Sequence, residues 1–155
     1  MTVNIINKKT VSFNILSYIK SLLLLMKPRV MSLVIFTSAV GLLTAPSVVS
    51  LKDSMIGIFF VAMGAGAAGA LNMWYEADLD KLMTRTCLRP IPTGKVNRSH
   101  ALIFGILLSI ISVYGLYYFT NTISAILLLS TISFYLFVYT IWLKRLTPQN
   151  IVIGG

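Results

Sequence analysis

The sequence predicts an all-α membrane protein with four membrane-spanning helices. The prediction rests on the composition, on the spacing of the apolar runs and on the placement of the basic residues. Of the 155 residues, 57% are hydrophobic and 11% are charged, and the mean hydropathy is +0.86. Soluble domains carry about 25% charged residues. The composition therefore excludes a soluble globular domain, and lipid is the expected surrounding of the chain.

Four apolar runs follow a basic N-terminal segment, residues 1–29, which we expect to be cytoplasmic. The runs cover about 30–49, 55–75, 101–120 and 123–143. Each is near the roughly 20 residues that a helix needs to cross the hydrocarbon core. All four are predicted to be helices, because lipid cannot satisfy the backbone groups of an open strand edge. The short connections predict that the first two runs form an antiparallel hairpin, as do the last two.

The basic residues set the orientation. Five Lys or Arg residues precede the first run, five lie between the second and third, and two follow the fourth, whereas Lys52 alone lies on the other side. By the positive-inside rule, the N-terminus, the site loop 76–100 and the end of the fourth run are cytoplasmic. In a bacterial cell this places the protein in the inner membrane. The net charge of +9 does not indicate a nucleic-acid partner, because the basic residues lie between apolar runs and form no patch on a polar domain.

The acidic residues are few and clustered. Asp53, Glu76, Asp78 and Asp80 are the only four in the chain, and the last three fall within five positions. On a helix, Asn72, Glu76 and Asp80 form one polar stripe within about 80°, and Asp78 points away from it unless the helix unwinds. Acids at a helix C-terminus oppose the macrodipole. They could pair with neighbouring basic side chains, or a hard cation such as Mg²⁺ could be bound by Asn72, Glu76, Asp78 and Asp80.

A diphosphate fits beside such a cation. Mg²⁺ on few carboxylates keeps positions open for phosphate oxygens. Arg85 and Arg89, followed by the turn-forming sequence PIPTG, supply guanidinium groups suited to phosphate. Lys81, Lys27 and Arg29 lie on the same side of the membrane and are further candidates, with interfacial anchoring as the alternative role of the last two. We interpret this part of the sequence as a cytoplasmic Mg²⁺–diphosphate site beside an apolar cavity, whose ligand is an isoprenyl diphosphate.

The sequence GAGAAG, residues 64–69, matches the dinucleotide-binding fingerprint in its letters. It lies late in an apolar run of membrane length, however, with no strand before it. Ala62, Gly66 and Ala70 recur every fourth residue, and Gly69 widens the same smooth side. This pattern is typical of close helix packing, and we interpret it in that way.

Three longer stretches resemble the UbiA-type intramembrane prenyltransferases, and within them the haem-farnesylating branch, the protohaem IX farnesyltransferases or haem O synthases. The stretches are KPRVMSLVIFTSAVGLL, GAGAAGALNMWYEADLDKLMTRTCLRPIPTGKV and IWLKRLTPQNIVIGG. The first Asp-rich motif of that family, N-x-x-x-D-x-x-x-D, falls on Asn72, Glu76 and Asp80. Its R-T-x-x-R-P continuation begins at Arg85 and includes Arg89.

The resemblance implies a nine-helix bundle of which this chain supplies the first four spans. It implies that Mg²⁺ and basic residues draw off the diphosphate of farnesyl diphosphate, and that a vinyl group of haem B takes the allylic cation. Water then completes haem O. Asn72, Glu76, Asp80, Arg85 and Arg89 are the catalytic residues by this resemblance. The implied partners are farnesyl diphosphate, haem B, membrane lipid, and the missing C-terminal half or a terminal-oxidase assembly factor.

Two features depart from the family pattern. Glu76 replaces the usual Asp, and its extra methylene moves the ligand oxygens. No acidic residue follows Asp80, so the second Asp-rich motif of the family is absent. We expect the chain to be the N-terminal portion of a longer protein, from a split gene, a frameshift or a partial sequence. Two alternatives stay open: a prenyltransferase acting on a quinone precursor, and a non-enzymatic four-helix membrane fragment that only binds or assembles.

Overall fold

The computed structural model describes residues 14–46 and 49–144. Lys8, Lys9, Arg145 and the sequence TPQNIVIGG lie outside these ranges. Within them the chain forms helices joined by turns and short loops, with no strand. The helices are α1 (Ile15–Leu25), α2 (Pro28–Thr44), α3 (Leu51–Leu82), α4 (Arg98–Phe119), α5 (Thr122–Ser133) and η1 (Phe134–Leu143), a π-helical continuation of α5.

The lengths and hydropathy of these helices confirm a polytopic membrane protein. In the described ranges, α3, α4 and the combined α5–η1 segment are each long and apolar enough to cross a membrane. The pair α1–α2 passes the same test as one span, bent by 54° at its break, and would make the fourth. The predicted all-α, membrane-spanning fold class is therefore confirmed.

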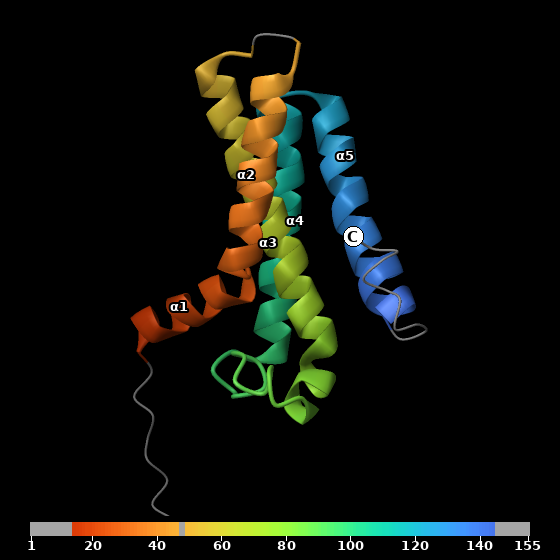
Figure 1. Cartoon of the computed structure of the whole chain (residues 1–155). Coiled ribbons are helices and arrows are strands. Elements are labelled where there is room, and N and C mark those ends of the chain that lie inside the picture. The colour runs from red at the N-terminus through yellow and green to blue at the C-terminus, as the bar shows by residue number, and fades with distance from the viewer. Residues whose placement is uncertain (1–13, 47–48, 145–155) are drawn as a thin grey trace, which may run out of the picture.

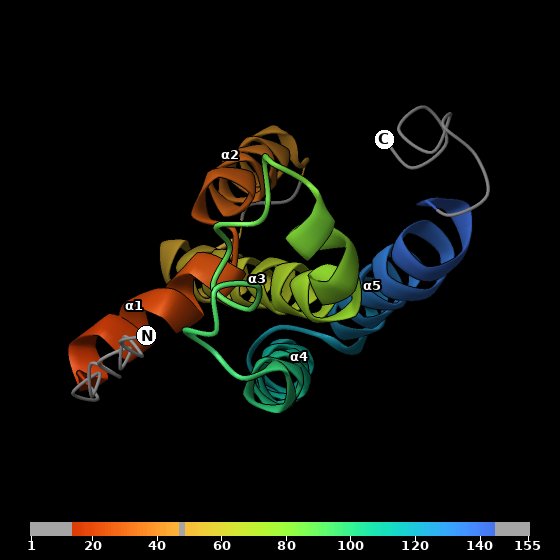
Figure 2. The ribbon, with the colours of Figure 1, turned by 90° about the horizontal axis from the view of Figure 1, so that it is seen from below.

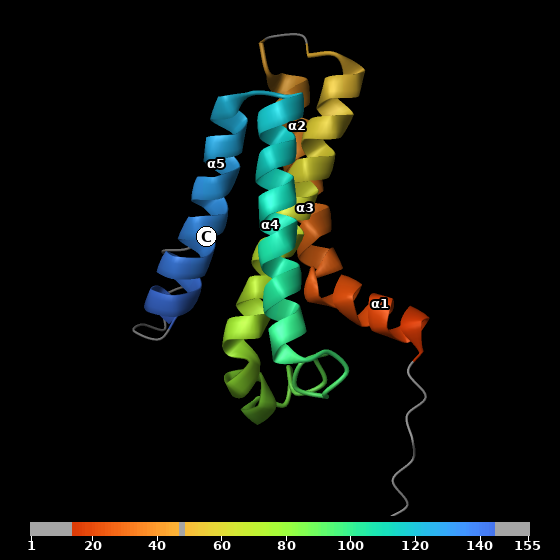
Figure 3. The same ribbon diagram turned by 180° about the vertical axis from the view of Figure 1, so that it is seen from behind.

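α3 lies at the centre of the bundle, with α2, α4 and α5 around it (Figure 1), as Figure 2 shows along the bundle axis. The end of α2, the start of α3 and the α4–α5 connection lie at one end. The loop 83–97, α1 and the last turn of η1 lie near the other end (Figure 3). This arrangement gathers most of the basic residues at a single end of the molecule.

The helix bounds differ from the predicted runs in three places. α2 ends at Thr44, before the expected end near 49, because Ala45 precedes Pro46 and is extended, with φ −65° and ψ 138°. α3 continues beyond the expected end near 75 to Leu82, so the loop predicted for 76–100 is non-helical only over 83–97. α1 forms inside the predicted N-terminal segment, where the side chain of Asn14 caps the helix by accepting the N–H of Leu16 at 3.1 Å.

The break between α1 and α2 packs against α3. Lys27 has φ 54° and ψ 68°, and it is the one non-glycine residue with positive φ in the described ranges. Pro28 then begins α2 at a position that suits its fixed φ. A Cβ atom added to Gly69 would lie 3.2 Å from the carbonyl oxygen of Met26, so glycine allows this corner to approach α3. The GAGAAG sequence thus lies within α3 at a helix-packing surface.

Candidate active site

The polar stripe on α3 is buried. Asn72, Glu76 and Asp80 are 1%, 5% and 2% exposed. α3 stays helical through the motif, so Asp78 points away from the stripe. The side chain of Asp78 is 69% exposed and accepts a hydrogen bond from Arg98 at 2.7 Å. The structure brings three of the four predicted metal ligands together and leaves Asp78 apart from them.

Three cations from three separate segments meet this stripe. The Nη1 atom of Arg89 donates to both carboxylate oxygens of Asp80, each at 2.8 Å, and lies 3.8 Å from Oε2 of Glu76. Lys144 donates from Nζ to Oε1 of Glu76, and Lys27 donates from Nζ to Oδ1 of Asn72. Each buried carboxylate is therefore paired, as burial of charge requires. The cluster holds one more positive than negative charge.

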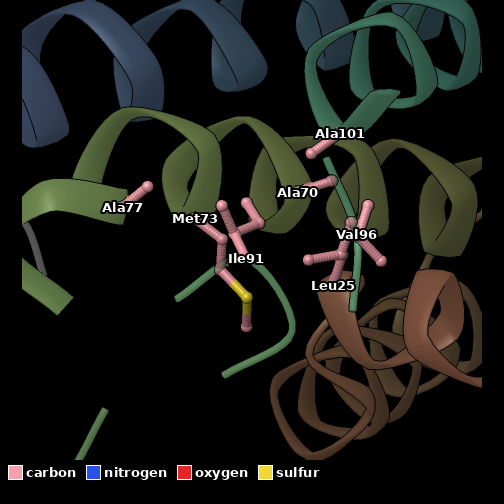
Figure 4. Close-up of a cluster of buried hydrophobic side chains, with 7 residues drawn as sticks. All are labelled: Leu25, Ala70, Met73, Ala77, Ile91, Val96 and Ala101. Carbon is pink, nitrogen blue, oxygen red and sulfur yellow. The ribbon is translucent and has the colours of Figure 1, made fainter. Parts of the chain in front are cut away.

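The loop 83–97 holds Arg89 against α3 through its own buried side chains. Ile91 and Val96 are buried in an apolar cluster with residues from α1, α3 and α4 (Figure 4). The hydroxyl of Thr86 donates to the carbonyl oxygen of Asp80 at 3.3 Å. Gly94 has φ 72°, a left-handed conformation that glycine adopts without steric cost, and it turns the loop back. The loop is thus a packed segment, and Arg89 is directed at the stripe by that packing.

The π-helical segment η1 runs parallel to α3 and contacts the stripe. Nδ2 of Asn72 donates to Oγ1 of Thr140 at 3.1 Å, and one turn further Lys144 reaches Glu76. Both pairs are separated by 68 residues along the chain. The equal spacing shows that α3 and η1 run in the same direction. The antiparallel helix α4 connects them. Thr140 is itself 1% exposed.

The other predicted phosphate-binding residues lie outside the cluster. The side chains of Lys81, Arg85 and Arg29 are exposed and make no hydrogen bond or ion pair with any described residue. Lys144 and Thr140, in contrast, belong to the cluster and were missed as site residues by sequence reasoning. Their i, i+4 spacing matches that of Asn72 and Glu76, and this is the signal that could have found them.

An apolar cavity of about 440 Å³ opens beside the cluster, between α2, α3 and α5. Lys27 and Tyr135 line its end near the stripe, and Val61, Leu116 and Ser124 line its other end. A second cavity of about 400 Å³ lies toward the opposite end of the bundle and shares these last three residues. Its α3 lining runs from Val61 to Gly69, eight residues apart, so the first cavity extends about 12 Å along this helix. Its size is typical of small-molecule sites.

The stripe offers oxygen donors suited to a hard cation. Within 14–46 and 49–144, no group of three or more His, Cys, Asp or Glu side chains converges as a metal site would. Glu76 and Asp80 nevertheless both lie within 4 Å of one nitrogen of Arg89, so the two carboxylates face a common cation. With the amide oxygen of Asn72, they fit an ion such as Mg²⁺ that takes its remaining oxygens from a ligand.

Fold and site together define an intramembrane helical bundle with a buried charged cluster at the mouth of an apolar cavity. Residues 33–155 match the UbiA prenyltransferase family, and the chain belongs to that family. No solved structure matches the chain.

The chain is similar to curated protoheme IX farnesyltransferases. It is 78% identical over 131 residues to the protein of that name from Pelagibacter ubique, covering 84% of this chain and 43% of the relative. It is 58% identical over 131 residues to the one from Bartonella bacilliformis, covering 84% and 42%. Protoheme IX farnesyltransferase 2 of Mesorhizobium japonicum is 57% identical over the same length, with 84% and 42% covered. The chain thus spans less than half the length of these relatives.

Proposed function

We propose that this chain forms the farnesyl diphosphate-binding part of a protohaem IX farnesyltransferase, which transfers the farnesyl group to a vinyl group of haem B and yields haem O. The observation that carries the proposal is the meeting of Lys27, Arg89 and Lys144 at Asn72, Glu76 and Asp80, at the mouth of an apolar cavity. A charged head group and an apolar tail are the two features that such a site would select. The names of the similar proteins point to the same reaction.

The three cations are the groups that would hold the diphosphate. Lys27 lies at the cavity mouth, and Arg89 and Lys144 lie on the neighbouring carboxylates. Their ammonium and guanidinium groups donate hydrogen bonds only, so they can turn from the carboxylates to phosphate oxygens as the ligand enters. The single excess positive charge favours an anion over a neutral prenyl alcohol.

A divalent cation would complete the head-group site. We propose that Glu76, Asp80 and Oδ1 of Asn72 hold Mg²⁺, which when bound would neutralise the negative charge that develops on the departing diphosphate. Arg89, which lies between the two carboxylates, would then be directed to the phosphate oxygens. In this arrangement Asp78 pairs with Arg98 at the start of α4 and does not bind the metal.

The cavity would hold the farnesyl tail. Residues 61–69 of α3 line it over about 12 Å, so an apolar tail would lie along this helix. Small residues of α3 and apolar side chains of α2 and α5 line it, so the allylic carbon would react in surroundings that contain few groups able to capture it. Water exclusion of this kind prevents hydrolysis of a reactive cation. The C1–O bond would break with its electron pair leaving on the diphosphate, and the outer vinyl carbon would form the new C–C bond. Water would then add to the cation left on the inner vinyl carbon and lose a proton, which gives the hydroxyl group of haem O.

We place this site at the cytoplasmic face of the bacterial inner membrane. Lys52 lies at the start of α3, and the other Lys and Arg residues in the described ranges belong to segments at the end that carries the site. An excess of Lys and Arg on one side is the signal that orients membrane proteins toward the cytoplasm. This placement supports an N-terminus on the cytoplasmic side.

A chimera tests the proposed reaction. The N-terminal part of the Pelagibacter ubique relative would be replaced by this chain, joined at the end of the aligned region, and expressed in a bacterium that lacks the enzyme. Haem O, detected by mass spectrometry, is the expected product, and the Asp80→Ala chimera should make none. A chimera that is stably inserted in the membrane but prenylates a quinone precursor and not haem would assign the chain to a different branch of the family.

A further inference from the structure

One continuous series of hydrogen bonds runs from the side chain of Lys27 through those of Asn72 and Thr140 to the main-chain carbonyl of Tyr135. Lys27 donates to Oδ1 of Asn72, and Nδ2 of Asn72 donates to Oγ1 of Thr140 at 3.1 Å. The hydroxyl of Thr140 donates to the carbonyl oxygen of Tyr135 at 2.8 Å. These bonds link the α1–α2 break, α3 and η1; Asn72 and Thr140 are each 1% exposed, and Lys27 is half-buried.

The direction of every bond in this series is fixed by chemistry. A carbonyl oxygen can only accept, so the single proton of Thr140 is committed to Tyr135. Oγ1 of Thr140 can then only accept a hydrogen bond from Asn72. The Asn72 atom that faces it must therefore be the donor, Nδ2. At the opposite side of the amide, the ammonium of Lys27 can only donate and selects Oδ1. A flipped amide would place donor against donor at Lys27 and acceptor against acceptor at Thr140.

The π-helical geometry of η1 determines which carbonyl accepts the proton of Thr140. In the α-helical segments, the hydroxyls of Thr37 and Thr131 donate to carbonyls four residues earlier. Thr140 donates to a carbonyl five residues earlier, as the wider π turn requires. Single π turns are frequent at functional sites. Here the π-helical segment presents a buried hydroxyl whose proton points away from α3 and whose lone pairs face Asn72.

We propose that Thr140 is a positioning residue, which holds the Asn72 amide with its carbonyl oxygen facing the head-group site. This rests on the proposed function, in which Oδ1 of Asn72 acts on a cation at the diphosphate. Thr140 touches neither diphosphate nor cation and acts through Asn72. Loss of its hydroxyl frees the amide to rotate and leaves the Nδ2 group buried without an acceptor.

The test compares three variants of the full 155-residue chain in lipid nanodiscs. Thr140→Val removes the hydroxyl with little change in shape, and Thr140→Ser keeps the hydroxyl. Thr37→Val is the matched control, because it removes an exposed helical hydroxyl that does not contact Asn72. The first measurement is hydrogen exchange of the Asn72 side-chain amide by NMR, with its signal assigned by its loss in Asn72→Gln. The second is the affinity for farnesyl diphosphate in Mg²⁺.

Exchange of the Asn72 amide protons should accelerate at least about tenfold in Thr140→Val, as expected for loss of one hydrogen bond, and stay unchanged in Thr140→Ser and Thr37→Val. Farnesyl diphosphate affinity should fall about tenfold in Thr140→Val alone, with farnesol affinity unaltered. Unchanged exchange in Thr140→Val would overturn the inference. So would equal loss of farnesol and farnesyl diphosphate affinity, since that pattern marks a general packing defect. If the wild-type chain fails to bind farnesyl diphosphate, the proposed function is wrong, whereas the exchange measurement still decides the role of Thr140.

Discussion

The guanidinium of Arg89 lies 2.8 Å from both carboxylate oxygens of Asp80, nine residues earlier in the chain, and Asp80 is only 2% exposed. The contact folds the loop 83–97 back over the end of α3. It also neutralises a carboxylate that the surrounding helices have removed from solvent. This pair therefore has a structural role, and the proposed function gives both residues a second role in ligand binding that can be tested separately.

Arg89→Ala should destabilise the chain by about 3 kcal/mol, because it leaves the buried Asp80 carboxylate without its partner. The measurement is the free energy of unfolding in mixed micelles. Adding Asp80→Asn to Arg89→Ala should recover part of the loss, because the uncompensated charge is then removed. Arg98→Ala is the matched control, since the Asp78–Arg98 pair is exposed and should contribute at most about 1 kcal/mol. Equal effects of Arg89→Ala and Arg98→Ala would contradict this assignment.

Asp80→Asn and Asp78→Asn should differ sharply in Mg²⁺-dependent binding of farnesyl diphosphate. Asp80 faces the head-group site, so its neutralisation should weaken binding at least about tenfold, the scale of one charged hydrogen bond. Asp78 points to solvent and to Arg98, so Asp78→Asn should change the affinity less than about threefold. Calorimetric titration of both variants, with and without a metal chelator, provides the comparison. A larger loss at Asp78 would mean that α3 unwinds at the motif when the ligand binds.

Local periodicity was sufficient to predict part of the site from the sequence. Asn72, Glu76 and Asp80 are spaced for one helical face, and the structure places them on one face of α3. The cations that meet them arrive from distant segments, and no local pattern determines which ones. Lys27 reaches Asn72 from the α1–α2 break, where Lys27 itself has a positive φ. Lys144 reaches Glu76 through η1, in an apolar segment that a sequence pattern cannot distinguish from an α-helix.

The helix ends were predicted less well than the helices, for similar reasons. Hydropathy marks the part of α3 that lies in lipid, but α3 continues to Leu82 because the loop and η1 bury its polar end. Arg85 was predicted together with Arg89 as a phosphate-binding residue, because both guanidinium groups follow the acidic stripe and both match the R-T-x-x-R-P motif. The buried side chains Ile91 and Val96 orient the loop so that Arg89 faces the stripe, and the side chain of Arg85 is exposed. Packing of the loop, which sequence spacing does not reveal, separates the two arginines.

Val61→Ala should let the site accept a longer prenyl chain. Val61 lines both the apolar cavity and the second cavity, whose lining is partly polar, so a smaller side chain there would join them. The affinity ratio of geranylgeranyl to farnesyl diphosphate should rise at least about tenfold, because the fourth isoprene unit would gain buried apolar area. Ile58→Ala is the control, since Ile58 lines only the second cavity of the two and its loss leaves the wall between them intact. The ratio is measured within each variant, so partial unfolding does not distort it. An equal rise in Ile58→Ala would contradict the role of Val61.

Cysteine labelling should place the Asp-rich site on the cytoplasmic side. In a Cys87→Ser background, which removes the single native cysteine, an exposed cysteine at Thr93 should react with an impermeant reagent only after the membrane is opened. A cysteine at Thr122, the first residue of α5, should react in intact cells, as should one at Ser54. Reaction of the Thr93 variant from outside would show that the orientation predicted from the Lys and Arg residues is wrong.

The 155-residue chain alone should bind farnesyl diphosphate but should not produce haem O at a sustained rate. Its described residues bring two carboxylates to the proposed head-group site, Glu76 and Asp80, and the proteins it resembles are about twice as long. Charge on a departing diphosphate is stabilised by groups placed around it in advance, and this is usually the largest catalytic contribution. One cluster on one side of the cavity supplies only part of that stabilisation. The measurement is purified chain in nanodiscs with haem B, farnesyl diphosphate and Mg²⁺, analysed by mass spectrometry over many potential turnovers, with the chimera as the positive control. Multiple turnovers by the chain, abolished by Asp80→Ala, would show that it is a complete enzyme, and its oligomeric state would then identify whether a second copy completes the site.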